Sequence, residues 1–76
     1  MRLEKYLELG GESVQRFSER SGVHEQSVYR YKRGERVPNP EATEKIKAAT
    51  EGAVTANDHH EAHNEWLNAQ QARGAA

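Results

Sequence analysis

The sequence predicts an all-α domain of about five short helices, and three kinds of observation support this. Apolar residues recur at helical spacing in several segments, and the C-terminal segment lacks the period-two alternation of a strand. Gly22, Gly34 and Gly52 follow such segments, where helices commonly end. Ser13 and Asn39 precede two of them and are good N-cap residues. The length of 76 residues suits one small domain.

Three helices are expected in the first half, over about residues 1–9, 13–20 and 25–33. A turn at Gly22 and Val23 joins the second to the third, and His24 is a poorer N-cap for the third than Ser or Thr. The apolar residues of each helix share a face, and we expect them to form the core: Leu3, Tyr6 and Leu7, then Val14 and Phe17, then Val28 and Tyr31.

Two more helices are expected in the second half. Asn39 and Pro40 start the fourth, which runs to about residue 50 with Ile46 inward. Thr55 to Asp58 resembles a capping box for a fifth helix over about 56–71, whose only large apolar anchor is Trp66. Residues 73–76 are expected to fray.

The composition favours a small intracellular protein without cofactors. There is no cysteine, no apolar run of membrane-spanning length and no apolar signal segment, so we expect a cytoplasmic protein of a bacterial host cell that does not bind membranes. The net charge is −1, but the first 40 residues carry +2 and the rest −3. The basic excess gathers at Arg30, Lys32, Arg33 and Arg36, which suits a limited contact with DNA.

The stretch SVQRFSERSGVHEQSVYRYKR, followed by Gly34-x-x-x-Pro38, resembles the helix-turn-helix of the lambda repressor/Cro family. The resemblance covers about residues 13–54 and implies a lambda-repressor-like helix-turn-helix domain over 1–54. Residues 55–76 would form a helical extension that packs on this domain or mediates dimer contacts. Ser21 departs from the family pattern, which usually has Leu or Ile there, and should weaken the core locally.

The same resemblance implies a Cro-type repressor of phage or prophage origin that places its third helix in the major groove of operator DNA. Specific binding would need two copies of the chain on a pseudo-palindromic site. The two copies would form a weak homodimer, assembled in part on DNA, with Trp66 or the Val54 region as the contact. The residues implied to read bases are Glu25, Gln26, Tyr29 and Arg30, and those implied to hold the backbone are Gln15, Arg33, Arg36 and Asn39.

Other interpretations remain open. An antitoxin-type autoregulator could bind a toxin through its acidic tail, and a helix-turn-helix without DNA binding could serve as a protein-interaction module. His59 and His63 have the i, i+4 spacing of a shared metal site, but no further ligands accompany them, so a polar helix face including His60 is favoured and no metal is expected. No catalytic constellation or phosphate loop is present in the sequence, so we do not expect an enzyme.

Overall fold

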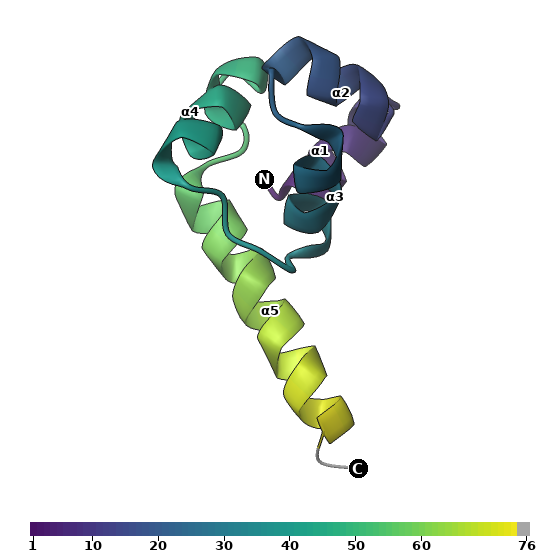
Figure 1. Cartoon of the computed structure of the whole chain (residues 1–76), viewed down its shortest axis with the longest axis vertical. Helices are drawn as coiled ribbons and strands as arrows, with labels where there is room; N and C mark the ends of the chain where they lie inside the picture. Colours follow the sequence, from purple (N-terminus) through teal and green to yellow (C-terminus); the bar gives the residue numbers. More distant parts are fainter. Residues whose placement is uncertain (75–76) are drawn as a thin grey trace.

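The computed structural model describes residues 1–74, and within that range it is entirely helical (Figure 1). This confirms the all-α prediction. None of the helices described over residues 1–74 is both long enough and apolar enough to cross a membrane. The five helices are α1 (Leu3–Gly10), α2 (Val14–Ser21), α3 (Glu25–Arg33), α4 (Pro40–Ala49) and α5 (Ala56–Gly74).

Local capping explains where the helices begin and end. The Ser13 hydroxyl accepts a hydrogen bond from the Arg16 amide at 3.2 Å, and Asn39 Oδ1 accepts one from the Ala42 amide at 2.8 Å. His24, expected to be a poor N-cap, does cap α3, because its Nδ1 accepts from the Gln26 amide at 3.2 Å. The short α2–α3 turn therefore has a side-chain acceptor at its end.

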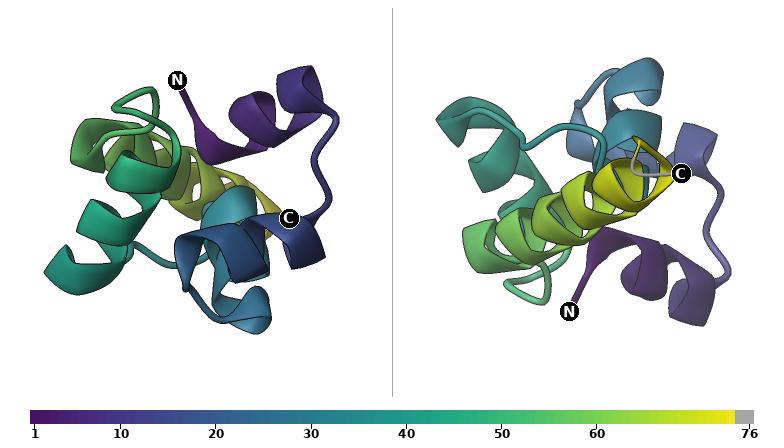
Figure 2. Two further views of the ribbon diagram at one scale, coloured as in Figure 1. Left: turned by 90° about the horizontal axis from the view of Figure 1, so that it is seen from above. Right: turned by 90° about the horizontal axis from the view of Figure 1, so that it is seen from below.

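The core lies among α1 to α4 and the segment that leads into α5 (Figure 2). Helix α3 contacts α1, α2 and α5, and α2 also contacts α4. The fully buried side chains of largest volume are Phe17, Val28, Ile46 and Val54. Val54 is 0% exposed, so the expectation that the Val54 region forms a dimer contact is wrong for its side chain.

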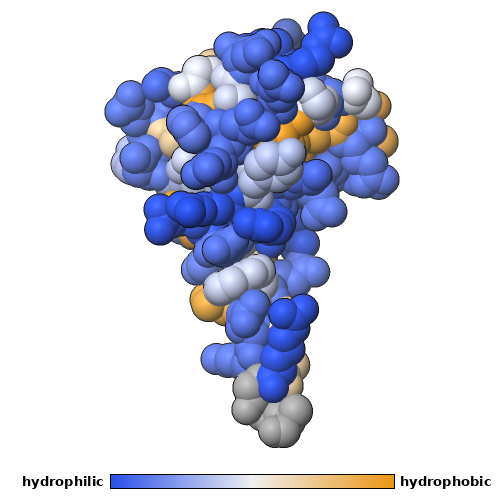
Figure 3. All heavy atoms as spheres, turned by 45° about the vertical axis from the view of Figure 1, so that its right-hand side comes forward, coloured by the Kyte–Doolittle hydropathy of each residue, from blue (hydrophilic) through white to orange (hydrophobic). Residues whose placement is uncertain are grey.

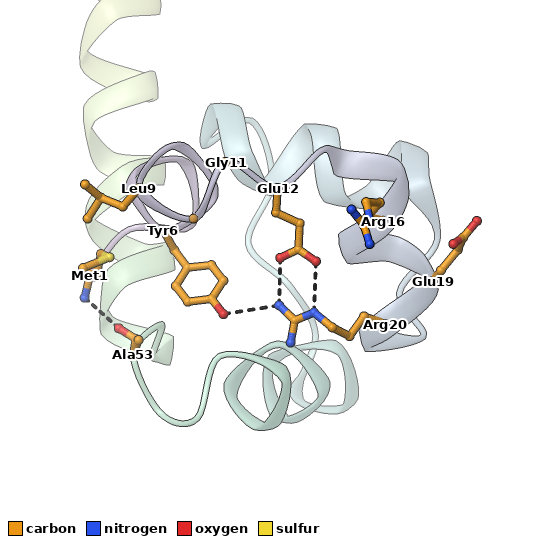
Figure 4. Close-up of a pocket in the computed structure, with 10 residues that line it drawn as sticks. Met1, Tyr6, Leu9, Gly11, Glu12, Arg16, Glu19, Arg20 and Ala53 are labelled. Atoms are coloured by element: carbon orange, nitrogen blue, oxygen red, sulfur yellow. Dashed lines mark hydrogen bonds and ion pairs between the residues drawn. The ribbon is translucent and has the colours of Figure 1, made fainter.

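Arg20 joins four parts of the chain in a polar network, and Figure 4 shows its contacts with Glu12 and Tyr6. Its guanidinium donates to both carboxylate oxygens of Glu12, at 2.8 and 3.0 Å, to the Tyr6 hydroxyl at 3.2 Å and to the Ala49 carbonyl. It also lies 5.3 Å from the centre of the Phe17 ring. Hydrogen bonding to Arg20 is the main reason that the pKa of Glu12 is below its ordinary value.

Ser21, next to the α2–α3 turn, has a local polar role. Its hydroxyl accepts a hydrogen bond from the Val23 amide at 3.2 Å, and the Ser18 hydroxyl donates to the Val23 carbonyl at 2.6 Å. Ser21, which was expected to weaken the core, therefore provides a hydrogen-bond acceptor for a backbone amide of the turn. The Val23 side chain remains buried.

Helix α5 starts at the expected place but extends further than predicted. The backbone amide and hydroxyl of Thr55 both donate to Asp58 Oδ2, at 2.8 and 3.0 Å, as expected for Asp58 in a capping-box position. The near end of α5 lies against the other helices and its far half projects from them (Figure 1). Arg73 is helical rather than frayed, and residues 75–76 of the predicted frayed end lie outside the described residues.

The histidines of α5 do not form the polar face that the sequence favoured. His59 is only 3% exposed and its ring meets the Tyr31 ring edge-on, with the ring centres 6.3 Å apart. His60 remains exposed, whereas His63 is half-buried. The burial of His59 was not predicted, because only apolar residues are counted when the buried face of a helix is identified from a sequence, and histidine is not one of them.

Candidate nucleic-acid interface

One face of α3 gathers four of the eight predicted contact residues. Gln26, Tyr29, Arg30 and Arg33 line a single open hollow, as expected for positions three, four and seven residues apart on one helix face. Tyr29 is 44% exposed although it is a large aromatic residue. On the opposite side of α3, Val28 and Tyr31 are buried, so the core fixes the direction in which this face points.

Glu25 lies exposed in the first turn of α3, outside that hollow. A carboxylate there is favoured by the helix dipole. Within residues 1–74, four side chains of α3 form no hydrogen bond or ion pair with the rest of the chain: Glu25, Gln26, Tyr29 and Arg30. These four groups are therefore available to an external partner.

The positive charge at the end of α3 is divided between two faces. Arg33 Nη2 forms an ion pair with Glu35 Oε2 at 2.9 Å, which offsets part of its charge, and Arg36 is exposed in the following loop. Lys32 instead borders a separate hollow with Glu4 and Glu8 of α1. The sequence grouped Lys32 with the three arginines. In the structure Lys32 lies outside the hollow that Arg30 and Arg33 line, although it shares another hollow, beside α5, with Arg33.

The predicted backbone-contact residues are spread more widely. Gln15 is exposed in the first turn of α2, and Arg36 is exposed beyond α3. The Asn39 side-chain oxygen is used by its helix cap, which leaves its amide group as the donor for a phosphate. Asn39 borders a hollow with Ser27 of α3 and Lys45 of α4, which sequence reasoning did not single out.

Helix α5 contacts the C-terminal end of α3 through an unusually close approach at Gly34. The Gly34 backbone has φ +80°, and a β-carbon there would lie 2.4 Å from the Ala62 carbonyl oxygen. His63 Nδ1 lies 2.8 Å from the Gly34 carbonyl oxygen, within hydrogen-bonding distance. The position of Gly34 after a helix predicted its C-cap conformation, but no sequence signal indicated this contact with α5.

Burial also sets the protonation of His59, close to the same junction. Desolvation lowers the pKa of His59 below its ordinary value, although the nearby Asp58 carboxylate acts in the opposite direction. Its Nε2 atom is buried and has no hydrogen-bond partner among residues 1–74. The neutral imidazole therefore fits this site, and its protonation would place a charge among buried groups.

The arrangement offers hydrogen-bonding and cationic groups on one face of a helix. Within the part of the chain that the structure describes, no three His, Asp or Glu side chains come together in a metal-binding arrangement. Most of the surface visible in Figure 3 is hydrophilic, over both the globular part and α5. Comparisons with protein-family models, curated proteins and solved structures gave no match.

Proposed function

We propose that this chain is a sequence-specific DNA-binding transcriptional regulator with a lambda-repressor-like helix-turn-helix. The observation that carries the proposal is the two-sided character of α3. It is held in the core by Val28 and Tyr31, and it presents Gln26, Arg30 and neighbouring polar groups on one exposed face. A short turn from α2 leads into it, which is the connectivity of helix-turn-helix proteins.

The chemistry of this face suits the edges of base pairs in the major groove. Arg30 can donate two hydrogen bonds to guanine, and Gln26 can pair with adenine. Glu25 can accept from a cytosine amine and disfavours a nearby phosphate, while Tyr29 can meet a thymine methyl group or a phosphate. These side chains form no internal hydrogen bonds within the part of the chain that the structure describes, so each can adapt to a base edge.

Phosphate contacts would come from the groups around that face. Arg33 and Arg36 lie at the end of α3 and just beyond it, and Gln15 and Asn39 are at the starts of α2 and α4. Because the whole chain carries a net charge of −1, the affinity must come from this local arrangement. Each phosphate neutralised would contribute about −0.9 to the slope of log K against log salt.

The proposed mode of action is repression by occupying an operator. The described residues form one small domain that presents one short reading helix, so a specific site requires two copies on a pseudo-palindrome. A Cro-type repressor acts in this way, and the proposal requires no cofactor. The antitoxin-type and protein-interaction alternatives share the same helices and differ in the partner that they bind.

The test is selection of bound sequences from a random DNA duplex library, followed by affinity measurements on the selected site. We expect a two-fold symmetric motif. Arg30→Ala should weaken specific binding by roughly 1–3 kcal/mol and relax one base position. Lys32→Ala is the matched control, because it removes the same charge from the same helix on the side that faces α1.

Two results would contradict the proposal. One is the absence of any enriched motif at low salt, which would favour a protein-interaction module. The other is an equal loss for Arg30→Ala and Lys32→Ala on both selected and random DNA, since that would show only a dependence on net charge.

A further inference from the structure

A hollow of about 250 Å³ lies where α1, α3 and α5 meet, and we name it the three-helix hollow. One buried residue from each helix lines it: Leu3, Tyr31 and His59 are 2%, 8% and 3% exposed. The half-buried Trp66 of α5 adds a third ring to its lining. The hollow therefore reaches apolar and aromatic groups of the core, which is typical of sites for small molecules.

The rings around the hollow are held in place by contacts within the chain. Tyr31 and His59 meet edge-on with ring centres 6.3 Å apart, and Trp66 is stacked on His63 with ring centres 6.0 Å apart. Burial lowers the pKa of His59, so its ring is uncharged near neutral pH. These surroundings suit an aromatic ring of a ligand. A cavity of about 150 Å³ can hold benzene, so this hollow has room for one ring with a short substituent.

The charged residues that line the hollow differ in whether they have partners. Three ion pairs join Arg2 to Glu65, Arg33 to Glu35, and Asp58 to the amino group of Met1. Lys32 and Glu4 also line the hollow, but within residues 1–74 they form no ion pair, either with each other or with another residue. Lys32 is half-buried, and an unpaired ammonium group in such a place favours an anion beside it.

We propose that the three-helix hollow binds a free aromatic α-amino acid. Its ring would lie beside Tyr31 and Trp66, its carboxylate at Lys32 and its ammonium group at Glu4. A ligand with both charges complements both unpaired side chains, whereas an aromatic acid would leave Glu4 unmatched and an aromatic amine would leave Lys32 unmatched. Lys32 and Glu4 also border the hollow beside Glu8, but that hollow has no aromatic residue in its lining.

Titration of the full chain with L-phenylalanine tests the proposal. Trp66 is the only tryptophan of the chain, so its fluorescence reports on this hollow, and isothermal calorimetry measures the same binding independently. We expect saturable binding with a Kd on the order of 1 mM or tighter. Two analogues each lack one charge: 3-phenylpropionate has no ammonium group and phenethylamine has no carboxylate. Each should bind roughly three- to fivefold more weakly than L-phenylalanine.

Two variants assign each ligand charge to its partner. In Lys32→Gln, L-phenylalanine should lose its advantage over phenethylamine, because the carboxylate no longer has a cation beside it. In Glu4→Gln it should lose its advantage over 3-phenylpropionate. The matched controls are Lys5→Gln and Glu8→Gln, which remove the same charges from exposed positions of α1 outside the hollow and should leave both advantages unchanged.

Three results would overturn the proposal. The first is the absence of saturable binding of L-phenylalanine up to its solubility limit. The second is equal or tighter binding of either analogue by the unaltered chain, which would assign the hollow to an aromatic acid, to an aromatic amine or to any small ring. The third is an equal effect of the variants and their controls. The proposal does not depend on DNA binding, because the titrations contain no DNA, and its failure would leave the proposed function standing.

Discussion

Replacing Gly34 with alanine would test whether close contact between α5 and the end of α3 holds α3 in place. Gly22 provides a matched control, because both residues end a helix in the left-handed conformation, with φ of +78° at Gly22 and +80° at Gly34. A β-carbon at Gly22 would meet nothing within 4 Å, whereas one at Gly34 would lie 2.4 Å from the Ala62 carbonyl oxygen.

The two substitutions share one cost and differ in another. Placing a side chain in the left-handed region costs about 1–2 kcal/mol at either position. Only Gly34→Ala also forces backbone to move, because Ala62 contributes a carbonyl oxygen rather than a flexible side chain. Overpacking of this kind adds roughly 1–3 kcal/mol. We therefore expect Gly34→Ala to be the more destabilising by that added amount.

Urea and thermal unfolding of the two variants would measure the difference. For a domain of this size, each kcal/mol lowers Tm by roughly 4–8 °C, so the two midpoints should be clearly separated. DNA binding should also weaken for Gly34→Ala under conditions where it remains folded. Equal losses of stability in the two variants would refute the reasoning, since they would show that α5 can move away from Gly34 at no cost.

Three further predictions concern the core, the polar network and the buried histidine. Phe17→Ala should cost roughly 3–5 kcal/mol and leave the chain largely unfolded by circular dichroism; an unchanged thermal midpoint would show that Phe17 is not core. Arg20→Met should lower the free energy of unfolding in urea by roughly 1–2 kcal/mol, because the partners of Arg20 lose their hydrogen bonds; the loss stays small because Arg20 is partly exposed. Arg16→Met, on the exposed side of α2, should change the free energy of unfolding little. The pKa of His59 is lower in the folded chain than the ordinary 6.5, so the unfolded chain binds more protons and stability should fall as pH drops below about 6.5, by at most about 1.4 kcal/mol per pH unit. His60→Gln should keep this dependence and His59→Phe should reduce it; an equal slope in both variants would assign it to other groups.

The sequence predicted those features that depend on residues close together in the chain. Ser13, Asn39 and Gly34 mark helix ends because a cap needs only a side chain and the next few backbone groups. Phe17 and Val28 were predicted as core because they are apolar at helical spacing. The grouping of Gln26, Tyr29, Arg30 and Arg33 follows from the same periodicity, since all four belong to one helix.

Features that join distant segments were not predictable in the same way. The Arg20 network unites Glu12, Tyr6 and a backbone carbonyl, and a charged residue on a helix ordinarily indicates a solvated face. Lys32 was grouped with its basic neighbours because they are adjacent in the sequence. Its position beside α1 depends on how α1 and α3 pack, which the sequence does not show. His59 was assigned to a polar face because histidine is a polar residue. Its burial depends on its contact with Tyr31 of another helix, which the sequence does not show.

In α3 the buried residues and the exposed polar residues are different ones, and this affects which substitutions the chain could accept during evolution. Val28 and Tyr31 hold the helix, and within the described residues 1–74 the side chains of Gln26 and Arg30 form no internal hydrogen bond or ion pair. Substitutions at the latter two positions should therefore cost little folding stability. Under the proposed function, a lineage could exchange one DNA target for another through a few such substitutions, without first acquiring compensating changes in the rest of the domain.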